Sequence, residues 1–413
     1  MIDYPNKLNI IFEKLNYFAI KPIIVGGYVR DFLLHIDSKD IDIELYGIDS
    51  LSKLEKIVEE FGDVNSVGKS FGVCKLKFED LDIDFSLPRK DSKTAQGHRG
   101  FSIQTDARLD FTTAASRRDF TINAIGYDVI EKKILDPFNG QIDLKNRVLK
   151  AVDIVKFEED PLRILRAVQF CARFRFSLDK SLFIKCEVMI KENFLNELAK
   201  ERVYEEIAKL LLKSKKPSLG FLLLKDLGGF SYFKELSNIS TKEFTQTMEY
   251  LDFHSSTLPN KKNITIMLSL LTYHLSQSDM LNFIHLLSNK KELIKELTLL
   301  KENQNYLNIY KYDDYHLYKL ASILHLERYL SIVNAVTPKK DKNLILKLKT
   351  RAKELGILNT KASEILHGRD LIKLGLKPSR EFSELLHEAY EAQMLGRFTT
   401  YEDATLWLKR RVT

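Results

Sequence analysis

The pattern of apolar positions changes near residue 150. Before it, short stretches alternate apolar and polar residues with a period of two, which is typical of strands with one buried face. Two helical patterns lie between these strands. The predicted strands span residues 23–25, 40–45, 73–78, 81–87 and 124–129, and the predicted helices span 28–34 and 51–61. The first 150 residues are therefore predicted to form a mixed α/β domain.

After residue 150 the apolar spacing becomes helical, as in the series Leu162, Leu165, Val168 and Ala172. Pro161 follows two acidic residues, which favours a helix start at this point. Residues 89–118 are polar without a regular apolar period, so we expect a long loop or flap there. The pattern predicts an α/β head followed by an elongated, all-helical remainder.

Composition excludes several classes of protein. Hydrophobic residues make up 44% and charged residues 29% of the chain, a globular balance. No apolar run reaches the roughly 18 residues of a membrane span, and the start lacks a signal-peptide pattern, so we expect a cytoplasmic protein. The three cysteines and nine histidines are scattered, which argues against disulfides and against zinc sites. The cysteines are expected to be buried apolar side chains.

Charge is distributed unevenly along the chain. Residues 1–150 hold 22 Lys and Arg against 24 Asp and Glu, whereas residues 151–413 hold 42 against 33. This split fits an acidic, metal-using head joined to a body that contacts a polyanion. Solvated, lysine-rich helix faces would account for much of the same excess.

A glycine turn joins the first predicted strand to a helix. Gly26 and Gly27 follow Val25, and Arg30 lies one helical turn later. Backbone N–H groups at such a turn can approach a phosphate, and an arginine side chain suits phosphate oxygens. A simple tight turn is the alternative, and the sequence is neither a dinucleotide fingerprint nor a P-loop.

Acidic residues alternate with aliphatic ones just after this turn. Asp40, Asp42 and Glu44 share one face of a strand, and Asp84 follows the same alternation in a later strand. Carboxylates spaced in this way can hold one or two Mg²⁺ ions, the arrangement that a nucleotidyltransferase needs. Two amphipathic strands with solvated acids are the alternative.

At this point the residues resemble a known family, the class II tRNA nucleotidyltransferase and bacterial poly(A) polymerase family. Five segments follow the order of the family's motifs: residues 26–31 with 39–42, 117–124, 136–140 with 143–144, 159–166 and 201–206. The resemblance implies an α+β architecture with a polymerase-beta-like head and an all-helical neck, body and tail. We expect the head over 1–148, the neck over 149–213, the body over 214–335 and a tRNA-contacting tail over 336–413.

The resemblance also implies roles for individual residues. Asp40 and Asp42 would bind Mg²⁺, with Asp84 as a third catalytic carboxylate. The nucleotide would be bound by a larger set, namely Gly26, Gly27, Arg30, Arg118, Asp119, Asn123, Asp160, Arg163 and Arg166. For Asp119 the alternative is a helix cap. Glu201 and Arg202, in the last motif, are expected to be structural.

Asp160 and Arg163 suggest how a nucleotide is chosen without a template. Cytosine and adenine each present an amino donor beside a ring-nitrogen acceptor, which suits a carboxylate that accepts and a guanidinium that donates. Guanine and uracil would leave both protein groups unmatched, at about 1–3 kcal/mol each. The two residues lie three apart on a predicted helix and so share a face, and together they can accept CTP and ATP, as the resemblance implies. A surface ion pair is the alternative.

Within the family, the chain is most similar to the CCA-adding type. Residues 90–116 match the family's flexible loop at full length, and Ser70 stands where poly(A) polymerases carry a basic residue. We therefore expect addition of C, C and A to tRNA from CTP and ATP, with no membrane or DNA partner. An A-adding enzyme, a poly(A) polymerase and a non-catalytic RNA-binding protein remain alternatives.

Overall fold

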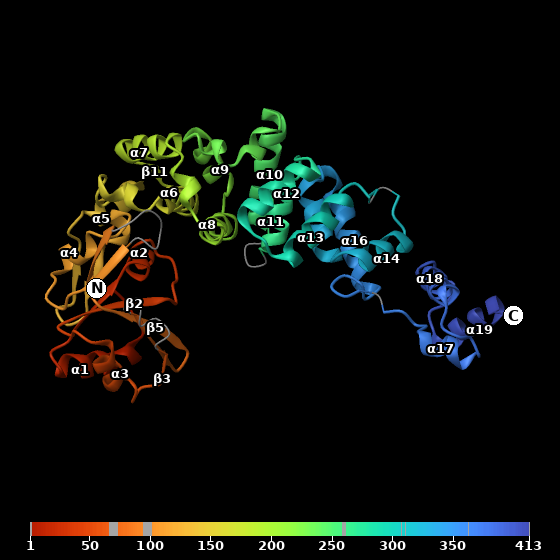
Figure 1. Ribbon diagram of the computed structural model, residues 1–413, viewed down its shortest axis with the longest axis horizontal. Helices are drawn as coiled ribbons and strands as arrows, with labels where there is room; N and C mark the ends of the chain where they lie inside the picture. The colour runs from red at the N-terminus through yellow and green to blue at the C-terminus, as the bar shows by residue number, and fades with distance from the viewer. Residues whose placement is uncertain are drawn as a thin grey trace. The chain divides into compact units, whose positions relative to one another are not determined.

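The computed structural model describes residues 2–65, 73–93, 101–257, 262–306, 308–309, 311–361 and 363–412. The chain divides into two compact units, Met1–Lys234 and Glu235–Thr413. Strands are concentrated in the first part of the first unit, coloured red to yellow in Figure 1, and helices make up nearly all that follows. The α+β class is thus confirmed, while the finer division into head, neck, body and tail stays a prediction.

A seven-stranded sheet organises the start of the first unit. Its strand order is β3-β4-β5-β2-β1-β8-β9, and β2 and β5 run parallel while the other neighbours are antiparallel. Each predicted strand is present to within two residues at either end. The strands are β1 (Lys21–Val25), β2 (Ile41–Tyr46), β3 (Asp63–Asn65), β4 (Val73–Phe78), β5 (Leu81–Ser86), β8 (Gly126–Asp128) and β9 (Lys133–Leu135).

Burial of aliphatic residues holds the sheet in the core. Ile41, Ile43 and Leu45 of β2 are at most 2% exposed, as their period-two spacing predicts. Helices α1 (Asn9–Tyr17) and α3 (Leu51–Val58) contact each other and pack on β1 and β4, respectively. Helix α2 (Gly27–Leu33) contacts β1 and β2 and begins at the predicted glycine turn. The turn is therefore fixed between the two central strands.

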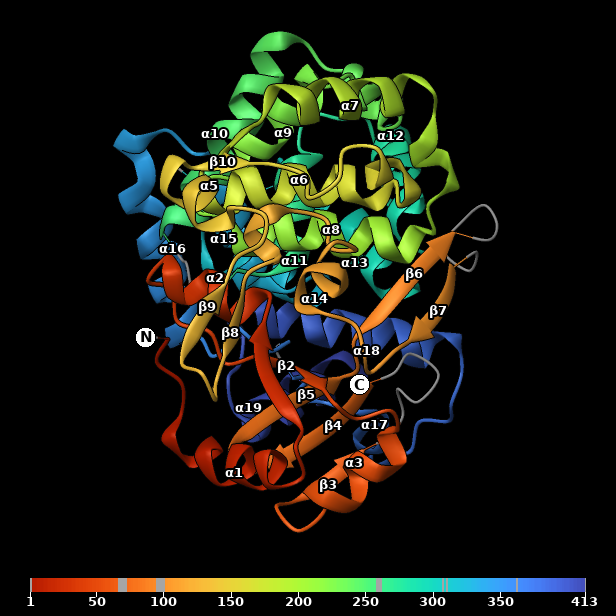
Figure 2. The same cartoon turned by 90° about the vertical axis from the view of Figure 1, so that its left-hand side faces the viewer.

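Of the long loop or flap expected over residues 89–118, the loop alternative is wrong, because the segment contains regular structure. The segment contains a hairpin of β6 (Arg89–Lys93) and β7 (Phe101–Thr105), followed by helix α4 (Phe111–Ala115). Figure 2 shows this hairpin beside the main sheet. A two-stranded ribbon is held by backbone hydrogen bonds, so apolar periodicity cannot reveal it. Ser70 and residues 94–100 lie outside the described residues.

The rest of the first unit is helical. Helix α6 packs against α8 and α9, and its predicted apolar positions are all at most 7% exposed. Pro161 is the N-cap of α6, which confirms the predicted helix start. The helices are α5 (Gly140–Asn146), α6 (Leu162–Phe174), α7 (Lys180–Lys191), α8 (Lys200–Lys213) and α9 (Ser218–Asp226), and the short strands β10 (Val148–Leu149) and β11 (Ser177–Leu178) pair with each other.

All three cysteines are buried and free, as expected. Burial raises the pKa of the Cys171 and Cys186 thiols, so neither favours the reactive thiolate form.

The second unit is an array of helices. Helix α11 packs against α10, α13 and α15, and a separate apolar cluster joins α17, α18 and α19. In the described part of the chain, no helix combines the length and apolar character required to cross a bilayer. The helices are α10 (Thr241–Thr257), α11 (Ile264–Leu271), α12 (Gln277–Leu287), α13 (Lys291–Glu302), α14 (Asp314–Ile323), α15 (Leu326–Val336), α16 (Lys342–Glu354), α17 (Gly368–Lys373), α18 (Arg380–Met394) and α19 (Tyr401–Val412).

Candidate active site

The glycine turn places its backbone next to a half-buried arginine. Gly26 has a φ of +67°, a conformation that favours glycine, and a Cβ there would lie 2.9 Å from Nη1 of Arg118. At Gly27 a Cβ would meet only Nη2 of Arg30, at 3.6 Å. Gly26 is therefore required by the protein's own packing. The protein's own packing does not require glycine at position 27. A ligand that approaches the backbone there would explain the glycine.

The predicted acidic residues lie side by side on β2 and β5. Asp42 is the direct register partner of Asp84, and Asp40 immediately precedes β2 (Figure 2). Asp40 and Asp42 are exposed, whereas the Asp84 carboxylate accepts a hydrogen bond from Nζ of Lys75 at 2.8 Å. The acids are thus brought together, although Asp84 is also ion-paired.

Electrostatic crowding is visible at Asp42. Partial desolvation raises the pKa of this carboxyl, and the carboxylates of Asp84 and Asp40 add to the rise, although Arg118 opposes it. Across the described residues, no three His, Cys, Asp or Glu side chains already form a metal-binding group. A divalent cation between Asp40 and Asp42 would nevertheless relieve this repulsion, and carboxylate oxygens are ligands that Mg²⁺ prefers. The residues present fit such an ion.

A second group of predicted residues forms a continuous hydrogen-bonded chain. Arg30 donates to Asn123 at 2.6 Å, Asn123 donates to Asp119 at 2.9 Å, and Arg166 donates to Asp119 at 2.6 Å. Burial opposes ionisation of Asp119, but Arg166 and Asn123 outweigh it and hold the pKa of Asp119 below its usual value. Asp119 is thus an internal counter-ion and does not cap the short helix Thr121–Asn123.

Arg30 is held more tightly than the sequence suggests. Its guanidinium also bonds to Asp31 at 2.6–2.8 Å and lies about 5 Å from the ring centroids of Phe170 and Phe174. The side chain is only 5% exposed overall, although it lines a cleft described below. Its donors therefore already have protein partners, a property that sequence spacing does not show.

The expected geometry of Asp160 and Arg163 is wrong in one respect. Asp160 is in extended backbone before α6, so the two residues do not share a face of that helix. Asp160 is ion-paired at 2.9 Å with Arg202 of α8, and Arg163 donates to the backbone oxygens of Lys156 and Arg117 at 2.9 and 3.0 Å. The proline at 161 explains the break, because it disfavours helical backbone in the residue before it.

Glu44 is the residue that sequence reasoning placed on the acidic face without giving it a role. It is fully buried and accepts a hydrogen bond from Arg117 at 3.0 Å, with Nη2 of Arg118 at 3.8 Å. The alternation that continues from Asp42 through Glu44 to Tyr46 could have drawn attention to it.

Asp40 and Asp42 lie between two hollows of the first unit. One, of about 700 Å³, is lined by acidic and basic residues of β3, β4 and β5, including Asp84. The other is a cleft of about 920 Å³ that also contains Gly27 and Arg30. Its remaining wall is strongly basic and includes Lys39, Arg147, Arg173, Arg175, Lys213 and Lys215.

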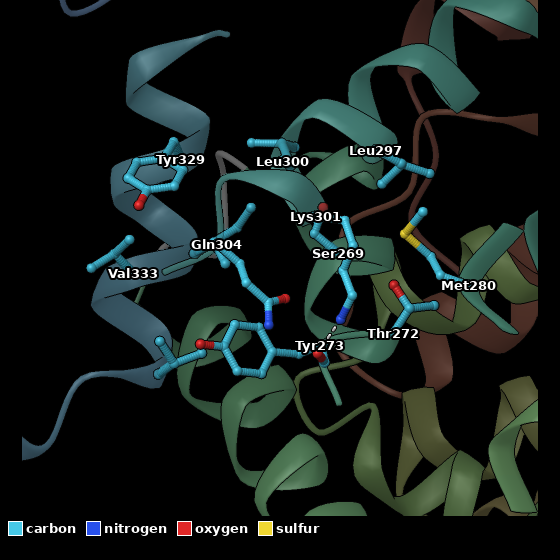
Figure 3. A pocket seen from close by; sticks show the side chains of 12 residues that line it. Ser269, Thr272, Tyr273, Met280, Leu297, Leu300, Lys301, Gln304, Tyr329 and Val333 are labelled. Atoms are coloured by element: carbon cyan, nitrogen blue, oxygen red, sulfur yellow. Dashed lines mark hydrogen bonds between the residues drawn. The ribbon is translucent and has the colours of Figure 1, made fainter. Parts of the chain in front are cut away.

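A third cavity lies within the second unit and has a different character. Figure 3 shows its lining, mostly apolar side chains around Lys301, which donates to the backbone oxygen of Tyr273 at 2.7 Å. At about 20 Å³ it has room for roughly one water molecule. None of the predicted site residues lines it.

Comparisons with known proteins place this geometry in a family. Residues 23–150 match the model for a poly A polymerase head domain, and residues 175–239 match one for a probable RNA and SrmB-binding site of polymerase A. A CCA-adding enzyme of Francisella tularensis subsp. tularensis (strain FSC 198) is 30% identical over 343 residues, covering 79% of this chain and 91% of that protein.

A multifunctional CCA protein of Neisseria meningitidis (strain FAM18) is 36% identical over 205 residues, which is 50% of this chain and 46% of that protein. The chain thus matches about half the length of that longer relative.

Solved structures share the fold. The CCA-adding enzyme of Bacillus stearothermophilus in complex with CTP superposes with a TM-score of 0.77 at 21% identity, covering 99% of this chain and 98% of that one. The Thermotoga maritima CCA-adding enzyme complexed with tRNA superposes with a TM-score of 0.67 at 21% identity, covering 100% and 97%. Given its identity to the Francisella enzyme over nearly that enzyme's full length, the chain belongs to the CCA-adding branch of the class II tRNA nucleotidyltransferase and poly(A) polymerase family.

Proposed function

We propose that this protein adds C, C and A to the 3′ end of tRNA from CTP and ATP, without a template and with release of pyrophosphate. The observation that carries the proposal is that an exposed acid pair, Asp40 and Asp42, lies beside a glycine turn and a half-buried arginine pair, Arg117 and Arg118. The Francisella relative is a CCA-adding enzyme, and two solved CCA-adding enzymes of the same fold are in complex with CTP and with tRNA.

Asp40 and Asp42 would hold Mg²⁺, with Asp84 as a third carboxylate. The ion would acidify the attacking tRNA hydroxyl and neutralise charge on the phosphates when bound. Asp42 is prepared for this role because desolvation, together with the charges of Asp84 and Asp40, raises the pKa of its carboxyl, so a bound cation would be favourable there. In the absence of the ion, Lys75 provides Asp84 with a counter-charge.

The nucleotide would extend from the glycine turn toward α6. Gly26 and Gly27 present backbone, and Arg118 lies against the turn with an unpartnered Nε, so it can receive the triphosphate. Asp160 and Arg163 would bind the Watson–Crick edge of cytosine or adenine. Arg202 orients Asp160, and two backbone oxygens orient Arg163. This favours one fixed pattern of hydrogen-bond donors and acceptors facing the base.

The basic cleft would receive the RNA strand. Arg147, Arg175, Lys213 and Lys215 line it and form no ion pair within the described part of the chain. Cationic side chains around a groove favour a phosphate backbone over an uncharged ligand and recognise shape more than sequence. We also propose that the protein works in the cytoplasm, where tRNA and both nucleotides are available.

The test uses purified protein, Mg²⁺ and tRNA transcripts that end before CCA, after C or after CC. Each transcript receives CTP, ATP or both, and products are resolved at single-nucleotide length. Three additions that stop at A are expected, and EDTA should abolish them until excess Mg²⁺ is restored. A single A on only the CC-ended transcript would indicate an A-adding enzyme, and long A tails would indicate a poly(A) polymerase.

A matched pair of variants separates catalysis from RNA binding. Asp40→Ala should lose extension while retaining tRNA affinity in a gel-shift assay. Asp49→Ala removes an exposed carboxylate beyond the end of β2, paired with Lys53, and should behave as wild type. If wild type binds tRNA and never extends it, the protein is a non-catalytic RNA-binding protein.

A further inference from the structure

Glu44 continues the acidic face of β2 into the core. It follows Asp42 by two residues, so both side chains lie on the same side of the strand. Asp42 is exposed, yet Glu44 is 0% exposed. A buried carboxylate is costly unless it is paired, so the partners of Glu44 explain why it is tolerated.

Three groups surround this carboxylate. The hydroxyl of Tyr46 donates to Oε1, Nη2 of Arg117 donates to Oε2 at 3.0 Å, and Nη2 of Arg118 lies 3.8 Å from Oε2. Burial and then the charge of Glu44 raise the pKa of the Tyr46 hydroxyl, so it remains a donor at neutral pH. The single carboxylate of Glu44 therefore compensates the charge of two adjacent guanidinium groups.

The arginine pair retains excess positive charge and unused donors. Burial, followed by the charge of Arg117, lowers the pKa of Arg118. In the described part of the chain, Nε of Arg117 and Nε of Arg118 are both buried without a hydrogen-bond partner. An anion that entered beside them would supply the missing acceptors and charge.

The location of the pair links it to the proposed reaction. Nη1 of Arg118 occupies the space that a side chain at Gly26 would fill, and the same guanidinium stabilises the charge of Asp42. The backbone oxygen of Arg117 also accepts from Arg163. The orientation of this pair therefore affects the glycine turn, the acid pair and a base-reading residue.

We propose that Glu44 is a positioning residue that holds Arg117 and Arg118 in the orientation that receives the nucleotide's triphosphate. This inference rests on the proposed function, because it assumes that the ligand is a nucleoside triphosphate. Glu44 itself touches neither phosphate nor metal. Without its charge, two half-buried guanidinium groups repel each other, and Arg118 moves away from the turn.

The decisive variant is Glu44→Gln, which keeps the size of the side chain and removes its charge. The KM for both CTP and ATP should rise on the order of 10- to 100-fold, because a displaced binding group commonly costs that much. The kcat should change far less, since phosphate contacts are made in both the ground and transition states. Inhibition by tripolyphosphate should weaken by the same factor, whereas the affinity for tRNA should stay unchanged.

A matched control is another buried carboxylate outside the site. Asp128 on β8 is 0% exposed and ion-paired with Lys21, so Asp128→Asn should lower the melting temperature without raising either KM. If Glu44→Gln lowers the melting temperature in the same way and leaves KM and tripolyphosphate inhibition unchanged, the inference is overturned.

A second variant decides the matter if Glu44→Gln does not fold. Tyr46→Phe removes one hydrogen bond to Glu44 and leaves its charge, so a smaller rise in both KM values is expected, and no rise overturns the inference. A failure of the proposed function looks different, because wild-type protein would then extend no transcript or would add only A.

Discussion

At the scale of single residues, neighbours decide what a carboxylate does. Asp42 and Glu44 are chemically similar and lie two positions apart on one strand face. Asp42 faces Asp40 and Asp84 in solvent, while Glu44 faces two guanidinium groups in the core. The first is therefore suited to attract a cation, and the second is already neutralised by the protein.

Replacing Asp42 should separate stability from activity. Because folding raises the pKa of Asp42, first through desolvation, the ionised carboxylate is less favourable in the folded than in the unfolded protein. The group's stabilising contribution is present below its unfolded pKa, about 3.9, and is lost as the pH rises through the higher folded pKa. Asp42→Asn should thus raise the melting temperature of the metal-free protein slightly at pH 7, but not near pH 3.

The same substitution should reduce extension by on the order of 10³-fold, since a metal ligand supplies several kcal/mol in the transition state. Thermal scans at both pH values and extension assays check this prediction. Asp49→Asn is the control. Lys53 lowers the pKa of Asp49, so removing this charge should lower, not raise, the stability at pH 7. A loss of stability in Asp42→Asn at pH 7 would contradict the electrostatic account.

At the scale of elements, the packing of α8 on α6 completes the proposed base-reading site. Arg202 lies in the first turn of α8, and its guanidinium makes two bonds, of 2.9 and 3.3 Å, to the carboxylate of Asp160 before α6. This arrangement corrects the expectation that Asp160 and Arg163 are ordered by one helix. The ion pair between Arg202 and Asp160 agrees with the expectation that Arg202 is structural. Any effect of Arg202 on the nucleotide is therefore exerted through Asp160.

Arg202→Gln should therefore affect selectivity more than stability. A partly exposed ion pair contributes about 0–1 kcal/mol, so the melting temperature should change little. Misincorporation of UTP and GTP should rise about tenfold as Asp160 loses its fixed orientation, which corresponds to about 1.4 kcal/mol of discrimination.

Competition assays with all four nucleotides measure this effect. Lys185→Gln removes a comparable ion pair with Glu158 and should leave selectivity unchanged. If Arg202→Gln keeps full discrimination, Asp160 is oriented by other contacts.

At the scale of the whole molecule, part of the excess of positive charge after residue 150 is concentrated around one cleft. This is the cleft that also contains Asp40 and Asp42, where Arg175, Lys213 and Lys215 come from the helical part of the first unit. Arg147, at the end of α5, adds a further positive charge from before residue 150. Solvated helix faces do not account for this convergence. Basic side chains that line the same cleft attract a polyanion together.

The double variant Lys213→Gln/Lys215→Gln should weaken tRNA binding and make it less sensitive to salt. Each lost phosphate contact lowers the slope of log K against log salt by about 0.7–0.9. The KM for CTP should remain unchanged, because neither lysine contacts the arginine pair.

Binding titrations between low and physiological salt test this prediction. Lys180→Gln/Lys191→Gln changes the net charge equally on α7, outside the residues that line the cleft, and should preserve the slope. Equal losses in both double variants would show that net charge, rather than the cleft, determines binding.

The sequence by itself determined the strands, the glycine turn and most of the helical remainder. These features depend on local periodicity and on residues with special backbone preferences, such as Gly26 and Pro161. It also determined the motifs that indicate the family. The hairpin within residues 89–118 escaped prediction because cross-strand backbone pairing leaves no apolar period in either strand.

Only the tertiary structure decided which charged residues are partners. Asp160 pairs with Arg202, Asp119 with Arg166, and Glu44 with Arg117, over separations of 42, 47 and 73 residues. Such pairs form when packing buries charges from distant elements together, because burial makes an unpaired charge costly and so selects its partner. Local sequence carries no record of that choice, since it depends on which elements meet in the core.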